Sequence, residues 1–218
     1  MTSSPQTFLI VDAHEVVLRG TRQALATAYP EAKLTTANTA KQALSQLKLN
    51  RPQLLVTDLL IPQDTQDSVK IATGIAFLRQ VMAAYPSLNI LVQSSHVRSL
   101  IRLKPSIHIH WAGFTIVDKK LPITDMLEKA DWSLRGISYT PAGMRAKLEL
   151  RPEWLQLLQL AFTQGLQDRT IAKQMNIAER TVRRYWASVQ AALNVSPAPG
   201  TNIRIQTGIY ARAAGLID

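Results

Sequence analysis

Residues 165–195 read GLQDRTIAKQMNIAERTVRRYWASVQAALNV, and this stretch decides how the C-terminal part of the chain folds. Its first half carries an apolar stripe at helical spacing, made of Ile171, Ala172 and Met175. Asp168 is placed to cap this helix, and Asn176 supplies a turn because asparagine tolerates a left-handed backbone. A second apolar stripe follows at helical spacing, formed by Val182, Trp186, Val189 and Leu193. The stretch therefore predicts two short helices joined by a tight turn.

The second of these helices carries basic residues outside its apolar stripe. Arg180, Arg183 and Arg184 lie on other sides of the helix from Val182 and Trp186. A helix that is held from behind and shows several arginines outward is what a helix-turn-helix places in the major groove of DNA. Arginine clusters on helices are more often only solvated surface, however, and composition alone favours that interpretation.

The order of the residues changes this balance. The pattern G-L-x-D-x-x-I-A-x-x-M-x-I-x-E-x-T-V-R-x-Y, which starts at Gly165, resembles the LuxR-type helix-turn-helix at the C-terminus of NarL/FixJ-type response regulators. This resemblance implies double-stranded DNA as a partner, bound by a homodimer on two half-sites. The DNA-contacting residues that we infer are Lys173, Arg180, Thr181, Arg183 and Arg184. Arg183 and Arg184 are the first candidates for base edges or adjacent phosphates. Ala178 stands at the N-cap of the second helix where the family usually has serine, which forfeits about 1 kcal/mol of capping.

The composition also favours an anionic partner. The 218 residues hold 25 Lys and Arg against 15 Asp and Glu, which gives a net charge of +10. Such a balance favours nucleic acid before a membrane surface. The chain has no cysteine, which excludes disulfides and thiolate metal sites. No apolar run approaches the ~18 residues of a membrane span, and the N-terminus lacks a basic region before an apolar core, so we expect a soluble cytoplasmic protein.

The N-terminal part alternates short apolar runs with helical patterns. The runs that predict strands lie at 7–11, 33–37, 53–57, 89–93 and 114–117. This alternation predicts a doubly wound α/β fold with a parallel five-stranded sheet. Ligand chemistry in such sheets gathers at the carboxyl ends of the strands. Because Asp12 and Asp58 each follow a strand directly, we expect them to converge.

The same order of elements resembles the receiver domain of response regulators. Asp58, in VTDLLIP, stands at the place of the phospho-accepting aspartate, which implies a sensor histidine kinase as a partner. Ser94 matches the hydroxyl residue that contacts the phosphoryl group, and Lys119 matches the lysine before the last helix. Asp12 matches one of the two acids that hold Mg²⁺ together with Asp58. Ala13 stands in the place of the second acid, so weaker metal binding is expected.

Two segments depart from the receiver pattern. The loop at 63–73, beside the phosphorylation site, is longer than expected. In 99–111, SLIRLKPSIHIHW, Pro105 interrupts the expected fourth helix and IHIHW alternates like a strand. His108 and His110 would share one face of that strand and could hold a metal. No third ligand is evident nearby, so a surface or packed pair is the preferred interpretation.

These patterns predict an organisation in three parts. Residues 1–137 form a receiver-like domain, 138–150 a linker, and 151–218 an all-α helix-turn-helix domain. A helix at 153–163 should support the helix-turn-helix. The apolar side of a final helix is predicted from Ile203, Ile205, Ile209 and Ala213.

The leading hypothesis is a DNA-binding transcriptional regulator of the two-component type, controlled by phosphorylation of Asp58. The alternative is a phosphorylation-independent receiver that acts as a protein–protein adaptor or answers to a ligand, which the missing acid at Ala13 and the long loop favour. An enzyme is not expected, because the sequence offers neither a glycine-rich phosphate loop nor a nucleophile–base pair.

Overall fold

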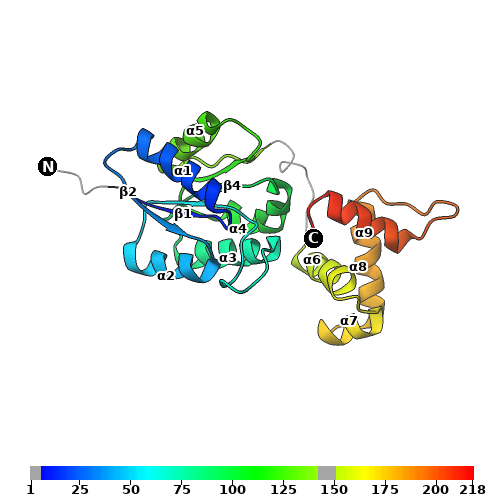
Figure 1. Ribbon diagram of the computed structural model, residues 1–218. Helices are drawn as coiled ribbons and strands as arrows, with labels where there is room; N and C mark the ends of the chain where they lie inside the picture. The colour runs from blue at the N-terminus through cyan, green and yellow to red at the C-terminus, as the bar shows by residue number, and fades with distance from the viewer. Residues whose placement is uncertain (1–5, 142–150) are drawn as a thin grey trace. The chain divides into compact units, whose positions relative to one another are not determined.

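The computed structural model describes residues 6–141 and 151–218, and the chain divides into two compact units, Met1–Arg145 and Ala146–Asp218. The predicted linker at 138–150 lies mostly outside the described residues, which stop at 141 and resume at 151. The first unit is an α/β layer structure and the second is all-helical (Figure 1). Among the described helices, none is both long and apolar enough to cross a membrane.

The first unit is built on a parallel sheet with the strand order β2-β1-β3-β4-β5. Its strands are β1 Thr7–Val11, β2 Lys33–Ala37, β3 Leu54–Thr57, β4 Asn89–Gln93 and β5 Phe114–Val117. The side chains of β3 and β5 are buried throughout, as expected for strands that are covered on both faces. The predicted five-stranded parallel sheet is therefore confirmed.

Helices cover both faces of this sheet (Figure 1). They are α1 Glu15–Ala28, α2 Ala40–Asn50, α3 Ile71–Ala84, η1 Val97–Leu103, α4 Lys104–His108 and α5 Ile123–Leu134. Side chains of α1 and α5 pack with Phe8 and Ile10 on one face, whereas those of α2 and α3 pack with Leu9 and Val11 on the other. Neighbouring residues of β1 thus serve opposite cores, because side chains alternate along a strand.

A capping bond fixes where α2 begins, and a glycine sets how closely α3 approaches the loop after β3. Thr39 caps α2 by accepting the backbone N–H of Gln42 at 3.1 Å. Gly74 lets α3 lie directly on the loop after β3, since a Cβ at this position would be 2.1 Å from the carbonyl oxygen of Leu59. The loop that follows Asp58 is therefore held against α3.

Residues 99–108 are helical and no strand follows in 109–111, so the predicted strand-like alternation of IHIHW is wrong. The 3₁₀ helix η1 runs directly into α4, and Pro105 lies in the first turn of α4, where proline needs no N–H partner. His108 is exposed, whereas His110 is half-buried and its Nε2–H donates to the carbonyl of Leu88 at 2.9 Å. The two histidines therefore do not share a strand face.

His110 makes the stability of the first unit sensitive to acid. Its Nδ1 is buried without a hydrogen-bond partner among the described residues, and burial holds the pKa of His110 below its usual value. The folded state keeps the ring neutral, so stability is complete above the pKa of the unfolded chain and falls as pH drops below it. We expect the melting temperature to drop between pH 7.5 and 5.5 by less in His110→Asn than in the wild type. His108→Asn, at an exposed site, is the matched control, and equal drops in wild type and His110→Asn would contradict the prediction.

The second unit is a bundle of short helices. These are α6 Pro152–Leu158, its continuation as the π-helical turn η3 Gln159–Thr163, α7 Asp168–Gln174, α8 Glu179–Ala192 and α9 Ile203–Ala213. The predicted helix at 153–163 is present, but its last five residues form the wider π turn. Phe162 in that turn makes a T-shaped contact with Trp186, with ring centroids 5.7 Å apart. The predicted stripe of Val182, Trp186, Val189 and Leu193 is buried in this core.

The buried side of α9 differs from the prediction. Thr207, Gly208 and Ala211 are buried, whereas Ile205 and Ile209 are 63% and 58% exposed. A Cβ on Gly208 would lie 2.8 Å from the Phe162 ring, so this glycine sets the face that meets the core. The predicted apolar side with Ile205 and Ile209 is therefore wrong, because close approach to Phe162 selects small residues.

Candidate nucleic-acid interface and acidic site

The turn between α7 and α8 is closed by backbone hydrogen bonds. Asn176 has a φ of 53°, the left-handed conformation expected from the sequence. The N–H of Ile177 donates to the carbonyl of Ala172 at 2.9 Å, and the N–H of Asn176 donates to that of Lys173 at 3.2 Å. These two bonds form a Schellman motif, which ends α7 and directs the chain into α8.

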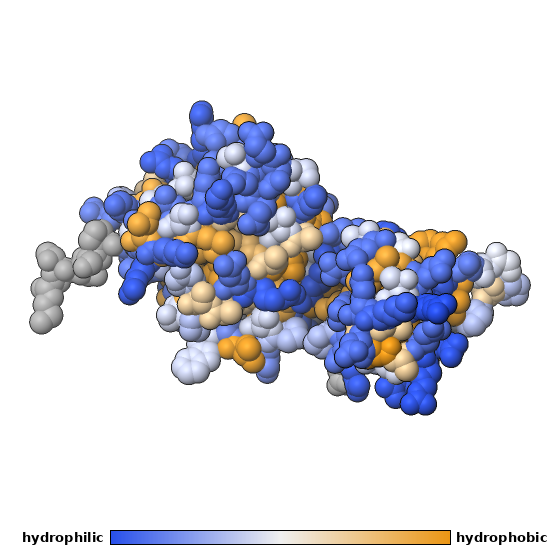
Figure 2. Space-filling model, turned by 90° about the horizontal axis from the view of Figure 1, so that it is seen from below, coloured by the Kyte–Doolittle hydropathy of each residue, from blue (hydrophilic) through white to orange (hydrophobic). Residues whose placement is uncertain are grey.

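The outer face of α8 is basic and the inner face is apolar. Arg180, Arg183 and Arg184 are exposed, and Thr181 is half-buried at the start of the helix. Lys173, on α7, is exposed and borders an open hollow next to Asn176 and Glu179. In Figure 2, hydrophilic side chains cover much of the visible face of this unit. The structure thus leaves all four predicted basic residues accessible to a partner.

The sequence predicted one further residue of this face and missed another. Ala178 is the N-cap of α8 and makes no side-chain capping bond, as expected. Arg169 also lines the hollow beside Lys173. It was not among the DNA-contacting residues inferred from the sequence, although a basic residue in the first turn of α7 pointed to it. A basic residue there adds to the positive charge at the turn.

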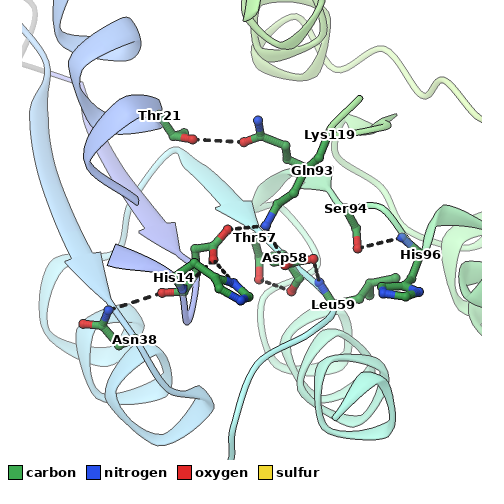
Figure 3. A network of polar contacts seen from close by, with 11 residues as sticks. His14, Thr21, Asn38, Thr57, Asp58, Leu59, Gln93, Ser94, His96 and Lys119 are labelled. Atoms are coloured by element: carbon green, nitrogen blue, oxygen red, sulfur yellow. Dashed lines mark hydrogen bonds and ion pairs between the residues drawn. The ribbon is translucent and has the colours of Figure 1, made fainter. Parts of the chain in front are cut away.

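Asp12 and Asp58 converge where the strands end, together with Ser94 and Lys119 (Figure 3). Asp12 follows β1, Asp58 follows β3, Ser94 follows β4 and Lys119 lies after β5. The Nζ of Lys119 donates to Oδ2 of Asp12 at 2.5 Å and to Oδ2 of Asp58 at 2.6 Å. Both carboxylates are 4% exposed, and Ser94 is fully buried. The predicted convergence of Asp12 and Asp58 is confirmed.

Electrostatics favour the charged forms of Asp58 and Lys119. Burial would raise the pKa of Asp58, but hydrogen bonds from Lys119 and Ser94 outweigh it and hold that pKa below its usual value. Burial likewise would lower the pKa of Lys119, and its bonds to Asp12 and Asp58 raise it instead. A negatively charged Asp58 beside a fixed ammonium is therefore available at neutral pH as a nucleophile.

Known proteins resemble this chain in both of its units. Residues 155–198 match the family of bacterial regulatory proteins described as the luxR family. The matched residues lie within the second unit, which is therefore a LuxR-type helix-turn-helix domain. Over 216 residues the chain is 26% identical to the DNA-binding transcriptional activator DevR/DosR of Mycobacterium tuberculosis (strain ATCC 25618 / H37Rv), covering 93% of this chain and 92% of that protein.

Solved structures of response regulators share the fold. One contains two RcsB dimers bound to two parallel DNAs, with a TM-score of 0.58, 22% identity and coverage of 96% of this chain and 98% of that chain. The RcsB response regulator of Salmonella typhimurium gives a TM-score of 0.61 with 22% identity, covering 95% and 99% of the two chains. The resemblance to NarL/FixJ-type response regulators is thereby confirmed, and the chain has their organisation, with a LuxR-type domain at its C-terminus.

Three helices of the LuxR-type domain meet at one carboxylate that was predicted to be a cap. The N-cap of α7 is Gln167, and Asp168 lies in the first turn, so that prediction is wrong. The carboxylate of Asp168 accepts Nε1–H of Trp186 at 3.0 Å and both terminal nitrogens of Arg204 at 3.0 and 2.6 Å. The Arg204 guanidinium also lies 3.7 Å from the centre of the Trp186 ring. Asp168 therefore joins α7 to α8 and α9, because a buried indole N–H and an arginine both need an acceptor.

This contact predicts a stability effect that depends on charge and geometry. The Arg204 guanidinium holds the pKa of Asp168 below its usual value. We expect Asp168→Asn to destabilise the LuxR-type domain by about 1–3 kcal/mol, since one charge-assisted pair becomes neutral and one donor loses its acceptor. Urea unfolding followed by circular dichroism measures this loss. Asp131→Asn, which removes an exposed i,i+4 pair with Arg135 in the first unit, is the control with an expected change near zero.

The donor set at the acidic site partly suits a divalent cation. Ligand atoms of Asp12, His14 and Asp58 all lie within 4.8 Å of one another. Two buried carboxylates suit Mg²⁺, which prefers oxygen ligands and keeps several waters. Ala13 contributes no oxygen, and the third group in reach is an imidazole. The site therefore fits a divalent ion through two carboxylates, with fewer oxygen ligands than a site with two acids after β1.

The long loop after Asp58 is anchored to α2. The carbonyls of Pro62 and Gln63 accept the first free N–H groups of α2, those of Ala40 and Lys41, at 3.0 and 3.1 Å. An antiparallel bridge between Ile61 and Lys70 closes the loop on itself. Pro62 and Gln63, where the long loop begins, thus satisfy donors at a helix end.

Proposed function

We propose that this protein is a DNA-binding transcriptional regulator of the response-regulator type, in which the receiver-like domain controls the LuxR-type domain. The observation that carries the proposal is the exposed row of Arg180, Arg183 and Arg184 on α8, opposite a fully buried stripe. The relative DevR/DosR is described as a DNA-binding transcriptional activator, and RcsB is described as bound to DNA in dimers. A regulator of this kind acts in the cytoplasm and has no enzymatic role of its own.

The contacts follow from the geometry of the domain. With α8 in the major groove of double-stranded DNA, Arg183 and Arg184 reach base edges, and arginine suits the two acceptors of guanine. Lys173, Arg180 and Thr181 reach phosphates on either side of the groove. A homodimer on two half-sites doubles this set, so binding should weaken steeply with salt.

The direct test is the selection of DNA sites by the full chain. Repeated selection from random duplexes should enrich a two-fold symmetric or directly repeated sequence, because two recognition helices read two half-sites. The affinity for the enriched duplex should exceed that for scrambled DNA by at least about 10³-fold. No enrichment above the starting pool would reject the proposal.

Control by phosphorylation is the second part of the proposal. Asp58 accepts the phosphoryl group, a sensor histidine kinase supplies it, and Asp12 and Asp58 hold the cation that is Mg²⁺ in the receivers this domain resembles. A cation held by these carboxylates would supply positive charge to offset the charge that develops on the phosphoryl oxygens. Lys119 already lies between the two carboxylates and adds a second positive charge. The buried hydroxyl of Ser94, which now contacts Asp58, is in place to contact the phosphoryl oxygen instead.

Phosphorylation has a measurable consequence in the intact mass. After incubation with Mg²⁺ and a small phosphodonor, we expect one added phosphoryl group in the wild type and none in Asp58→Ala. Asp64→Ala, in the exposed part of the neighbouring loop, should still be labelled and is the matched control. No adduct, under conditions that label an ordinary receiver, would instead favour a receiver that works without phosphorylation through a partner protein or a ligand.

A further inference from the structure

The two layers of helices that cover the sheet of the first unit differ in charge. The layer of α2, α3, η1 and α4 packs on one face of the sheet, and the layer of α1 and α5 packs on the other (Figure 1). The helices of the first layer, which we call the basic layer, hold no Asp or Glu and six Lys and Arg residues, namely Lys41, Lys48, Arg79, Arg98, Arg102 and Lys104. The helices of the other layer hold three Lys and Arg against four acids, namely Arg19, Arg22 and Lys129 against Glu15, Asp125, Glu128 and Asp131. The charged side chains of the basic layer thus sum to +6, and those of the opposite layer sum to −1.

Part of this positive charge is open to solvent. Lys48 on α2 and Arg79 on α3 are exposed, and neither makes an ion pair with another described residue. Lys41 is also exposed, but its Nζ pairs with Oδ2 of Asp64 in the loop after β3 at 2.5 Å. The basic layer therefore presents uncompensated positive charge on the outer sides of α2 and α3.

A layer of one sign indicates an anionic partner. Like charges repel and work against the compact state, and the surfaces of soluble domains usually mix both signs. The layer of α1 and α5 is mixed in this way, so the excess is confined to one side of the same unit. A surface of one sign raises the local concentration of an oppositely charged partner. Duplex DNA carries one negative charge per ~1.7 Å of its axis, which makes it a partner of matching charge.

We propose that the basic layer binds the phosphate backbone of the DNA that flanks the half-sites read by α8. This inference rests on the proposed DNA binding by the LuxR-type domain and adds a second contact that does not depend on sequence. Because both units belong to one chain, DNA held by α8 is presented to the basic layer at a high effective concentration, and a few Lys and Arg contacts then suffice. Such contacts raise the affinity without changing the preferred sequence, since phosphates carry no base information.

The test is the salt dependence of DNA binding by the full chain, measured by fluorescence anisotropy on two duplexes. One duplex contains only the two selected half-sites, and the other extends them on each side by two helical turns, about 20 base pairs. The affinity of the wild type should fall more steeply with salt on the extended duplex. Lys48→Gln together with Arg79→Gln should lower the slope on the extended duplex by at least about one, because each lost phosphate contact removes about 0.9. The slope on the short duplex should stay the same.

Arg19→Gln together with Arg22→Gln is the matched control, because it removes the same two charges from the exposed side of α1. It should leave both slopes unchanged, and circular dichroism checks the fold of each variant. An equal change of slope in this control would overturn the proposal. An unchanged slope in the Lys48 and Arg79 variant would also overturn it and would favour an acidic protein surface as the partner of the basic layer.

The same titrations separate this inference from the proposed function. The wild type and the Lys48 and Arg79 variant should both prefer the selected duplex over scrambled DNA, because α8 is intact in both. Loss of this preference in the wild type would reject the proposed function and the inference with it. A preserved preference with an unchanged slope in the variant would reject only the role of the basic layer.

Discussion

Replacing Arg183 and Arg184 together with alanine is expected to abolish sequence-specific DNA binding while the LuxR-type domain stays folded. Both side chains are exposed on α8, on the side away from the buried stripe of Val182, Trp186 and Val189, so the core loses nothing. Each arginine that reads a guanine contributes about 1–3 kcal/mol of discrimination, and the two losses add in both half-sites of a dimer. Fluorescence anisotropy on the selected duplex measures the loss, and circular dichroism checks the fold.

The control for this experiment removes the same charge elsewhere. Arg19→Ala with Arg22→Ala lowers the net charge by the same two units on the exposed side of α1. It should preserve the preference for the selected duplex over scrambled DNA. Arg180→Ala should weaken binding to both duplexes alike and lower the salt dependence by about one counterion. An unchanged footprint in the Arg183 and Arg184 double variant would reject α8 as the reading element.

Trp186→Ala is expected to destabilise the LuxR-type domain by about 3–5 kcal/mol, the range for a large aromatic removed from a core. Trp186 is 3% exposed, makes a T-shaped contact with Phe162 and lies under the Arg204 guanidinium. Its loss also leaves Asp168 without the indole donor. A loss of this size is comparable to the total stability of a small domain, so DNA binding should fail together with the fold. Urea unfolding of the full chain followed by circular dichroism measures the effect.

Two variants separate packing from hydrogen bonding in this prediction. Trp186→Phe keeps an aromatic ring but removes the bond to Asp168, so it should cost less than alanine. Trp111→Ala, at a tryptophan that is 89% exposed in the first unit, should change stability by less than about 0.5 kcal/mol. A loss below about 1 kcal/mol in Trp186→Ala would contradict the central place that the structure gives this residue.

Elements that rest on local pattern were predictable. Most of the strands follow short apolar runs, and α8 follows a stripe that repeats within one helix, so nearby residues suffice to define them. The convergence of Asp12 and Asp58 was also predictable, because parallel strands bring their carboxyl ends to one edge. The structure of segment 99–111 was not predictable from local pattern. Pro105 can either interrupt a helix or begin a new one, and only packing decides between the two.

The sequence by itself determined the two architectures and the basic face of Arg180, Arg183 and Arg184, because periodicity and residue order are local properties. Only the tertiary structure decided which side of α9 is buried, since Gly208 must meet Phe162 from a distant helix. It likewise decided that Asp168 binds Trp186 and Arg204 rather than capping α7, and that Lys119 bridges Asp12 and Asp58. Those pairings join residues far apart in the chain, and a side chain selects among such partners only when packing has placed them within reach.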